Sequence, residues 1–178
     1  MRRTRTGLAA VALCATAVLT GCGPPLADHR LGMTVDDSGN PVIVLQDCKE
    51  GDVVELQLFD ESRTSQSFPG GEPPVPIAVY TTSEASKTVR QIPVKTGGAG
   101  WAPTAVVPAL RASASYKVRG WGKEHQSYGG QTIFTPNDLK SLKPGEVLYG
   151  VQMQVDSEVH VEKVRYPSLD EFSPSSCD

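Results

Sequence analysis

Residues 121–130 hold the densest group of side chains suited to binding a ligand. The segment follows an alternating strand pattern and places Trp121, His125 and Tyr128 among three glycines. Such a mixture of aromatic rings and hydrogen-bonding groups is typical of a loop that stacks on a sugar ring or seats a partner's side chain. The same composition fits a glycine-rich loop whose rings only cover the open end of a core. Both interpretations stay open from the sequence.

Trp101 follows a glycine-rich run and is a second candidate stacking surface, although a Trp in such a place more often caps a core. Hydrolysis would need a nucleophile, a base and an orienting acid that meet in space. His125 stands beside Glu124 and Ser127, but sequence neighbours seldom form such a triad, and the chain has no Gly-x-Ser-x-Gly elbow. The scattered cysteines and histidines do not predict a metal site. We therefore expect a protein that is not an enzyme and that uses no metal or cofactor.

The overall charge argues against nucleic acid as a partner. The chain has 178 residues with 17 Lys and Arg against 20 Asp and Glu, which gives a formal net charge of −3. Proteins that bind nucleic acid are usually basic. A chain of this length is long enough for a single domain with its own hydrophobic core.

The first 21 residues have the pattern of a signal peptide. Three arginines, Arg2, Arg3 and Arg5, precede an uncharged stretch at residues 7–20 that is rich in Ala, Val and Leu. This stretch is too short for a helix that crosses a hydrocarbon core of roughly 30 Å. We expect a signal-peptide helix that is removed on export. The arginine pair matches a twin-arginine export signal only weakly.

Leu19-Thr20-Gly21-Cys22 ends this segment and resembles the lipobox of bacterial lipoproteins. The resemblance implies that the Cys22 thiol takes a diacylglycerol thioether and that cleavage makes Cys22 the new N-terminus. Acyl chains such as palmitate would then hold the protein at the outer face of the cytoplasmic membrane. Cleavage also removes three arginines, so the mature chain is too acidic to rely on anionic headgroups. The alternative is an ordinary secretory signal cleaved near Ala27, which would discard Cys22.

Two cysteines, Cys48 and Cys177, remain in the mature chain once Cys14 leaves with the signal and Cys22 is lipidated. Outside the cytoplasm such a pair usually oxidises, so we expect a disulfide between them. The bond would attach the C-terminal tail to the strand that ends near Cys48. Free thiols and an intermolecular pair are the alternatives.

Short segments that alternate apolar and polar side chains predict β-strands along the mature chain. They lie at residues 33–35, 42–45, 53–58, 77–82, 88–94, 105–110, 115–121, 131–134, 146–155 and 158–166. We expect the first three to form a meander, with a turn at residues 36–40 between the first two. The oxygens of that turn lack the other ligands of a calcium loop. Thr135, Pro136 and Asp138 supply an N-cap, a first-turn proline and an acid, which predicts a short helix at residues 136–141.

Many short strands without a long helical period predict an all-β fold. We expect an antiparallel β-sandwich, either immunoglobulin-like or an open barrel, with one short helix. The expected regions are a signal peptide at residues 1–21, a lipidated tether at 22–30, the β-sandwich domain at 31–166 and a C-terminal tail at 167–178.

A run near the C-terminal end resembles small uncharacterised secreted lipoproteins of high-GC Gram-positive bacteria. It extends from Phe134-Thr135 through Leu139, Leu142 and Pro144-Gly145 to Val147. That resemblance carries no known activity. We expect a non-enzymatic binding or interaction module of the cell envelope, with an envelope protein or a cell-wall glycan as partner. A receptor for a glycan or a small ligand is the alternative, and a hydrolase assembled from distant segments is less favoured.

Overall fold

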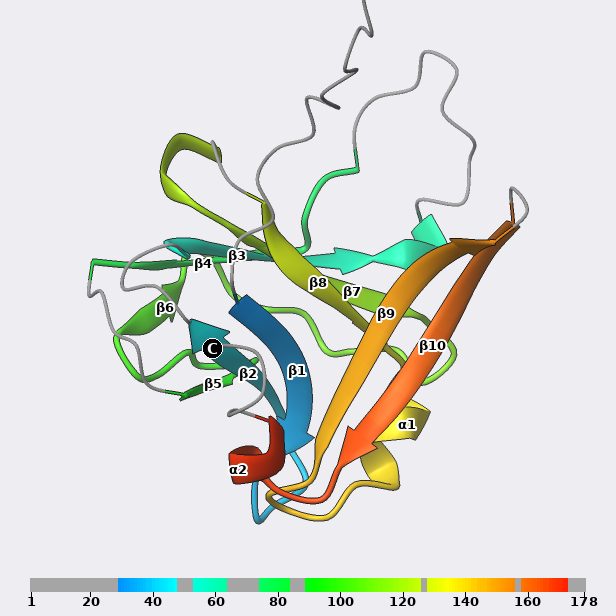
Figure 1. Ribbon diagram of the computed structural model, residues 1–178. Helices are drawn as coiled ribbons and strands as arrows, with labels where there is room; N and C mark the ends of the chain where they lie inside the picture. Colours follow the sequence, from blue (N-terminus) through cyan, green and yellow to red (C-terminus); the bar gives the residue numbers. More distant parts are fainter. Residues whose placement is uncertain are drawn as a thin grey trace, which may run out of the picture.

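The computed structural model describes residues 29–47, 53–63, 74–83, 89–125, 128–155 and 158–172. These residues form two antiparallel sheets that enclose a common core (Figure 1), which confirms the all-β sandwich expected from the sequence. Sheet I contains, in spatial order, β10 (Glu158–Tyr166), β9 (Val147–Val155), β1 (His29–Val35), β2 (Pro41–Asp47) and β5 (Arg90–Pro93). Sheet II contains β6 (Trp101–Pro103), β4 (Ala78–Thr82), β3 (Glu55–Asp60), β7 (Tyr116–Trp121) and β8 (Tyr128–Phe134).

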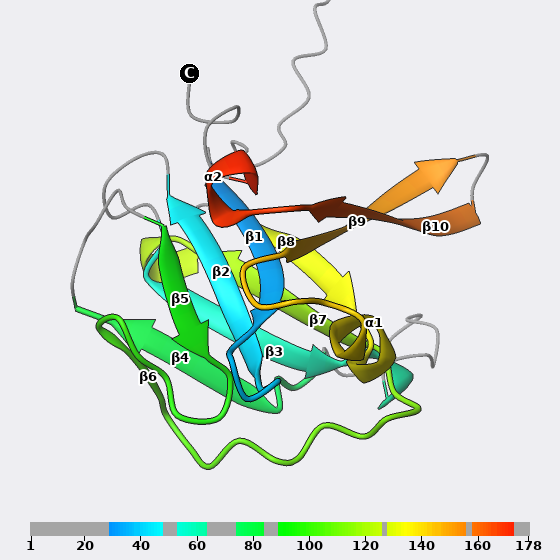
Figure 2. The same ribbon diagram turned by 90° about the horizontal axis from the view of Figure 1, so that it is seen from below.

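Short helices lie between and after the strands. The α-helix α1 (Pro136–Lys140) connects β8 to β9, and α2 (Leu169–Phe172) follows β10. Two single-turn 3₁₀ helices, η1 (Glu61–Arg63) and η2 (Lys123–His125), follow β3 and β7. In the view from below, the β9–β10 hairpin extends away from the rest of the sandwich (Figure 2). Within the described part of the chain, no helix is both long and apolar enough to cross a membrane.

The first two strands form the predicted hairpin. Asp36 closes its turn, because the carboxylate accepts hydrogen bonds from the backbone N–H groups of Ser38 and Asn40 and from the Asn40 side chain. Gly39 adopts a φ of +79°, a left-handed conformation that glycine adopts without strain. Short polar residues of this kind form the turn and need no metal.

The predicted meander of the first three strands is wrong. β3 belongs to sheet II, where it pairs with β4 and β7, while the second edge of β2 is taken by β5. Leu56 and Leu58 face the core from the opposite sheet. The pairing of β3 is therefore decided by burial between two sheets and not by its closeness to β2 in sequence. Pro93 lies in β5 at the edge of sheet I, where a residue without an N–H group is tolerated.

The strand predicted at residues 105–110 is absent, and residues 104–110 have no regular structure. Instead, the short strand β6 lies just before them. Pro103 and Pro108 lack the N–H group that a strand ladder needs, which limits pairing on either side. Val107 is only 7% exposed while its neighbour Val106 is 95% exposed, so the apolar residues that suggested a strand are not buried on one face.

The core lies between the two sheets and is built from alternating strand residues. On β7, Tyr116, Val118 and Gly120 face inward, as the sequence predicted. The rings of Tyr116 and Phe134 stack with centroids 5.8 Å apart. Burial raises the pKa of the Tyr80 hydroxyl, which donates a hydrogen bond to the carbonyl of Val94. Fully buried side chains of this size each stabilise the fold by roughly 1.5–3 kcal/mol.

One side of the sandwich is closed by β8 packing against β1 and β9. Gly150 makes this contact possible, because a Cβ atom there would lie 2.1 Å from the carbonyl oxygen of Ile133. Its N–H donates to Oγ1 of the fully buried Thr132 at 3.0 Å. The two sheets are therefore joined at this edge by direct backbone contact.

The predicted helix after β8 is confirmed as α1. Thr135 is its N-cap, and the side chains of Thr135 and Asp138 bond reciprocally to each other's backbone N–H groups. This capping box satisfies donors at the helix start that would otherwise have no partner. Leu139 anchors the helix in the core.

The beginning of the expected C-terminal tail is ordered by packing. Phe172 of α2 is fully buried against Val44 and Val147 on the outer face of sheet I. Gly32 leaves the space for it, because a Cβ atom there would lie 3.0 Å from Cζ of Phe172 and closer still to Val147. The sequence predicts a disulfide that attaches this tail to the strand ending near Cys48, and the buried ring of Phe172 supplies a contact in addition to that expected bond.

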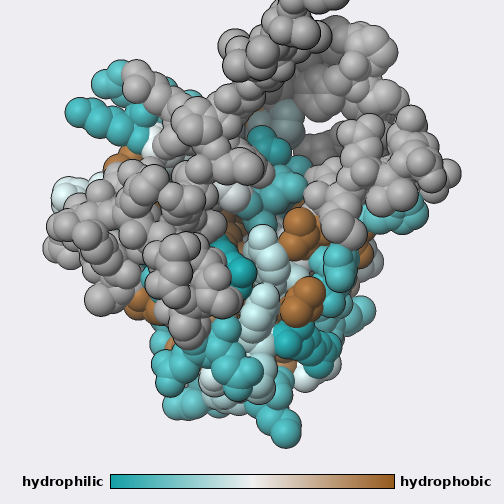
Figure 3. Space-filling view, viewed as in Figure 1, coloured by the Kyte–Doolittle hydropathy of each residue, from teal (hydrophilic) through white to brown (hydrophobic). Residues whose placement is uncertain are grey.

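The coloured part of the surface in Figure 3 is mostly polar, and its hydrophobic side chains lie in small separate groups. Among the described side chains of the projecting hairpin, Val161 and Val164 of β10 are hydrophobic and exposed, at 42% and 37%. Hydrophobic side chains scattered singly are ordinary on a protein surface.

Candidate functional site

Trp121 and His125 come together with polar residues of β3 on the outer face of sheet II. The Nε1–H of Trp121 donates to Oε1 of Gln57 at 2.9 Å, and Nε2 of Gln57 donates to Oε1 of Glu55 at 2.6 Å. The same Glu55 oxygen lies 3.1 Å from Nε2 of His125. We call these residues and Arg119 the Trp121 cluster.

The Trp121 ring already contacts two side chains of the same cluster. The His125 ring lies 5.0 Å from it between centroids, and the Arg119 guanidinium carbon lies 5.7 Å from its centroid. Arg119 also lies 5.6 Å from the centre of the Phe59 ring. These are cation–π and ring contacts that stabilise the cluster itself. They leave less of the Trp121 ring for stacking on a sugar.

The His125 side chain is 52% exposed, whereas that of its partner Glu55 is 23% exposed. Glu124 and His125 both have a φ of 56°, a left-handed conformation that is uncommon for residues other than glycine. The Glu55 carboxylate and the His125 ring form an acid and base pair, and no nucleophilic side chain hydrogen-bonds to this pair among the described residues. The cluster can bind a polar group more readily than it can perform catalysis.

Of the other two aromatic candidates, Trp101 belongs to the core of the sandwich and not to this cluster. Trp101 is only 3% exposed because it fills the edge of the core, with the Arg90 guanidinium carbon 5.8 Å from its ring centre. Its ring therefore has no exposed face for a ligand. Tyr128 pairs with Trp121 across β7 and β8, and its side chain lies outside the described part of the structure.

The lipidation residue Cys22 and the expected disulfide partners Cys48 and Cys177 lie outside the described residues. Lipidation and disulfide formation therefore remain predictions from the sequence.

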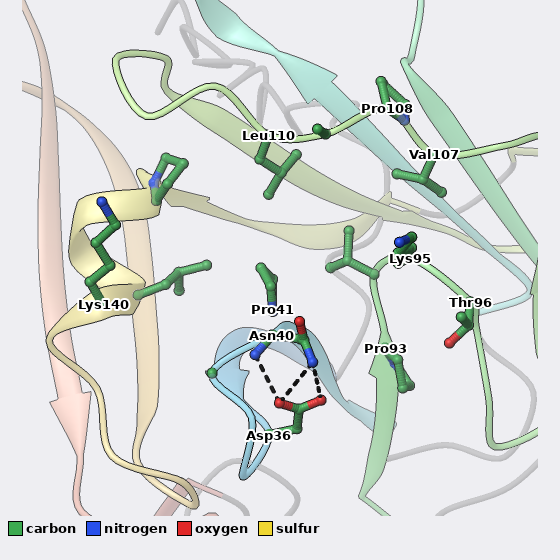
Figure 4. A pocket seen from close by; sticks show the side chains of 15 residues that line it. Asp36, Asn40, Pro41, Pro93, Lys95, Thr96, Val107, Pro108, Leu110 and Lys140 are labelled. Carbon is green, nitrogen blue, oxygen red and sulfur yellow. Dashed lines mark hydrogen bonds between the residues drawn. The ribbon is translucent and has the colours of Figure 1, made fainter.

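A pocket of about 560 Å³ opens at the end of the sandwich near α1 (Figure 4). We call it the end pocket. Four separate segments line it: the β1–β2 turn, the end of β5 with the residues after it, the irregular residues 107–110, and α1. Its lining residues are Asp36, Gly39, Asn40, Pro41, Pro93, Val94, Lys95, Thr96, Val107, Pro108, Ala109, Leu110, Pro136, Leu139 and Lys140. Its volume is in the range of pockets that bind small molecules.

The walls of the end pocket are mainly apolar. Val94, Val107 and Leu139 belong to the core of the sandwich, so the pocket reaches down to the core. Leu110 packs against this core while remaining partly exposed. Four of the lining residues are prolines, which have stiff rings and no N–H group to donate. The walls are therefore rigid and offer few hydrogen-bond donors.

Most polar groups around the end pocket are already engaged. The Asp36 carboxylate accepts four hydrogen bonds within its own turn, and those from Asn40 lower its pKa. The Thr96 hydroxyl donates to the carbonyl oxygen of Gly97 at 3.2 Å. Lys95 and Lys140 differ, because both are exposed and neither ammonium has a hydrogen bond or ion pair in the described structure. Figure 4 shows these two lysines on different sides of the pocket.

The wall segment at residues 107–110 is held in place by Arg111. The Arg111 backbone N–H donates to the Tyr116 hydroxyl at 2.7 Å, and its guanidinium lies 2.6 Å from Oδ2 of Asp60. The hydrogen bond from Arg111 to Asp60 raises the pKa of the guanidinium. Asp60 is only 4% exposed, so this ion pair connects the pocket wall to the buried end of β3.

The Trp121 cluster and the end pocket lie at opposite ends of β7. Tyr116 begins this strand on the pocket side, and Trp121 ends it. Five residue steps of about 3.3 Å separate them by roughly 17 Å along the strand. A ligand bound at one site would therefore not contact the other.

Comparison of this chain with protein-family models, with curated proteins and with solved structures found no match. Within the part of the chain that the structure describes, no group of three or more His, Cys, Asp or Glu side chains is placed to hold a metal ion. The candidate function is therefore argued from the two sites themselves.

The sequence missed the end pocket because its lining comes from four segments far apart in the chain. The sequence predicts a strand at residues 105–110, and a strand prediction does not indicate that residues 107–110 form a wall of the pocket. The clustering of Pro41, Pro93, Pro108 and Pro136 is a signal only once the fold places them together.

Proposed function

We propose that this chain is a lipid-anchored extracytoplasmic protein that acts, without catalysis, as a receptor for a small apolar ligand. The end pocket is the observation that carries this proposal. It has the volume of a small-molecule site, apolar walls continuous with the core, and prolines that keep it preformed. A preformed site loses little conformational entropy on binding, which favours affinity.

The lipobox at Leu19-Thr20-Gly21-Cys22 supports the anchoring part of the proposal. A Cys22→Ala variant should lack the diacylglycerol group and no longer partition into detergent. The mass of the mature N-terminal peptide checks this directly. Continued partition of the variant into detergent would refute the anchor, because no other lipid attachment is proposed.

Saturable binding of the neutral dye Nile red to the mature domain tests the receptor part. We expect the dye's fluorescence to rise on binding, and a Leu110→Asp variant to weaken binding by about tenfold or more because it places a charge in the apolar wall. Val106→Asp is the matched control, since Val106 lies in the same segment but is 95% exposed. Thr96→Trp blocks the pocket without altering the core.

The proposal is wrong if wild-type protein binds no dye saturably, or if both pocket variants bind as the control does. The thermal unfolding midpoint of each variant shows whether it is folded, so that loss of binding is not confused with loss of structure.

A second candidate is an interaction with another envelope component, a protein or a glycan, through the Trp121 cluster. The observation that favours it is the exposure of the His125 ring beside Trp121. Cross-linking in cells should then identify one recurrent partner, and a His125→Ala variant should lose it. Unchanged cross-links in that variant would remove the cluster as the contact surface.

A further inference from the structure

We infer that the ligand of the end pocket is an amphiphile with an apolar chain and an anionic head, of the class of a fatty carboxylate. This inference rests on the proposed function and adds the chemical class of the ligand. It is carried by the difference between the walls of the pocket and its rim. The walls are apolar side chains and prolines, while Lys95 and Lys140 stand at the rim.

The polar groups at the rim of the end pocket determine which charge the head of the ligand can carry. The Asp36 carboxylate is engaged by Ser38 and Asn40, and the Thr96 hydroxyl by the Gly97 carbonyl. The two ammonium groups have no partner in the described structure, and each carries three donors and no acceptor. A carboxylate accepts hydrogen bonds and carries the opposite charge, so either ammonium can bind it. A cationic head would be repelled by the same pair.

The apolar part of the ligand is selected by the depth of the pocket. Val94, Val107 and Leu139 are 4%, 7% and 3% exposed and belong to the core, so a chain that enters the pocket contacts core side chains. Each methylene buried there contributes about 0.8 kcal/mol of transfer free energy, which corresponds to about fourfold in affinity. The charged head stays at the rim, where water still reaches the exposed lysines.

Three competitors with apolar chains of nearly the same length distinguish the contribution of the head from that of the chain. Dodecanoate, dodecanol and dodecyltrimethylammonium are each tested for displacement of bound Nile red from the mature domain, the two ionic amphiphiles below their micelle concentrations and dodecanol below its solubility limit. We expect dodecanoate to bind about tenfold more tightly than dodecanol, a difference of about 1.4 kcal/mol, and the cationic amphiphile to bind most weakly. Raising the salt concentration should weaken the binding of dodecanoate and leave the binding of dodecanol unchanged.

The double variant Lys95→Gln/Lys140→Gln should bind dodecanoate no better than dodecanol, with dodecanol binding unchanged. Lys123→Gln/Lys143→Gln is the matched control, because it removes the same charge from exposed lysines outside the pocket. All four residues are on the surface, so the variants should fold as the wild type does.

Equal affinity for dodecanoate and dodecanol in the wild type would show that the pocket does not select an anionic head. The proposal of a receptor for apolar ligands would still stand. An equal loss of dodecanoate binding in both double variants would lead to the same conclusion, because the effect would then come from net charge. If none of the three amphiphiles displaced the dye, the anionic class and the proposed receptor would both be wrong.

Discussion

The Nζ atom of Lys163 on β10 lies 2.7 Å from Oδ2 of Asp138 on α1. The same oxygen accepts hydrogen bonds from the backbone N–H and the hydroxyl of Thr135, each at 2.7 Å. Asp138 therefore caps α1 and also attaches it to the projecting hairpin. Leu139 and Lys140, the next two residues, line the end pocket, so this contact fixes one of its walls.

The first prediction concerns Asp138 and acid stability. Burial raises the pKa of this carboxyl, but the hydrogen bonds from Lys163 and Thr135 lower it more, so its pKa lies below the usual range. A lowered folded-state pKa stabilises the protein above the unfolded-state pKa of about 3.9, and this stability is lost as pH falls through the folded-state value. Asp138→Asn should therefore lower the free energy of unfolding by about 1 kcal/mol near neutral pH and by less in acid.

Urea unfolding of the wild type and of this variant between about pH 6 and about pH 3 measures the effect. Asp37→Asn is the control, because Asp37 lies exposed in the first hairpin turn. A constant difference between the Asp138 variant and the wild type over this range would contradict the role given to the ionised carboxylate.

The second prediction concerns the backbone contact between β8 and β9. Gly150→Ala places a Cβ atom against the Ile133 carbonyl, at a separation of 2.1 Å before relaxation. Backbone must move, so we expect the free energy of unfolding to fall by about 2 kcal/mol or more. Gly39→Asn is the control, since Gly39 has nothing within 4 Å of its Cβ position and Asn tolerates its left-handed φ. Equal free energies of unfolding for the two variants would show that β8 and β9 do not make this close backbone contact.

The third prediction concerns the ion pair that holds the pocket wall. Arg111→Leu removes the cation from the buried carboxylate of Asp60. Arg111 itself is 53% exposed, which screens the pair, so we expect only a small loss in unfolding free energy. The Nile red affinity should fall with it, because residues 107–110 lose one of their attachments. Lys123→Leu serves as the control, and unchanged dye affinity in the Arg111 variant would separate this ion pair from the pocket.

The fourth prediction concerns the cysteines outside the described residues. Protein purified without reductant should be lighter by two hydrogens than the reduced form, with Cys48 and Cys177 recovered in one linked peptide. Replacing both by Ser should lower the free energy of unfolding by about 4–5 kcal/mol in the chain-entropy account. Two alkylated thiols in the unreduced protein would show that the bond does not form.

Local patterns were sufficient for several elements of the fold. The inward alternation of Tyr116 and Val118 predicted β7, and Thr135 and Asp138 predicted α1, because strand faces and helix caps depend on residues a few positions apart. The placement of β3 was not predictable in this way. Its partner strands come from other parts of the chain, and the choice depends on packing between the sheets.

The candidate sites divide in the same way. Trp121 and His125 lie in one short segment, so their closeness followed from the sequence. Glu55 and Gln57 complete the cluster from a strand more than 60 residues away, as their separations of 70 and 64 positions from His125 and Trp121 show. The end pocket could not be predicted from the sequence, because it forms only where four segments from different parts of the chain meet.

Chemical-shift mapping of the mature domain during titration with dodecanoate locates the binding site residue by residue. Binding in the end pocket predicts saturable amide shifts concentrated at Val94, Val107 and Leu110, with none at Trp121 or His125 at the other end of β7. Shifts centred on Trp121 and His125, or no saturable shifts at all, would contradict the assignment of the end pocket as the binding site.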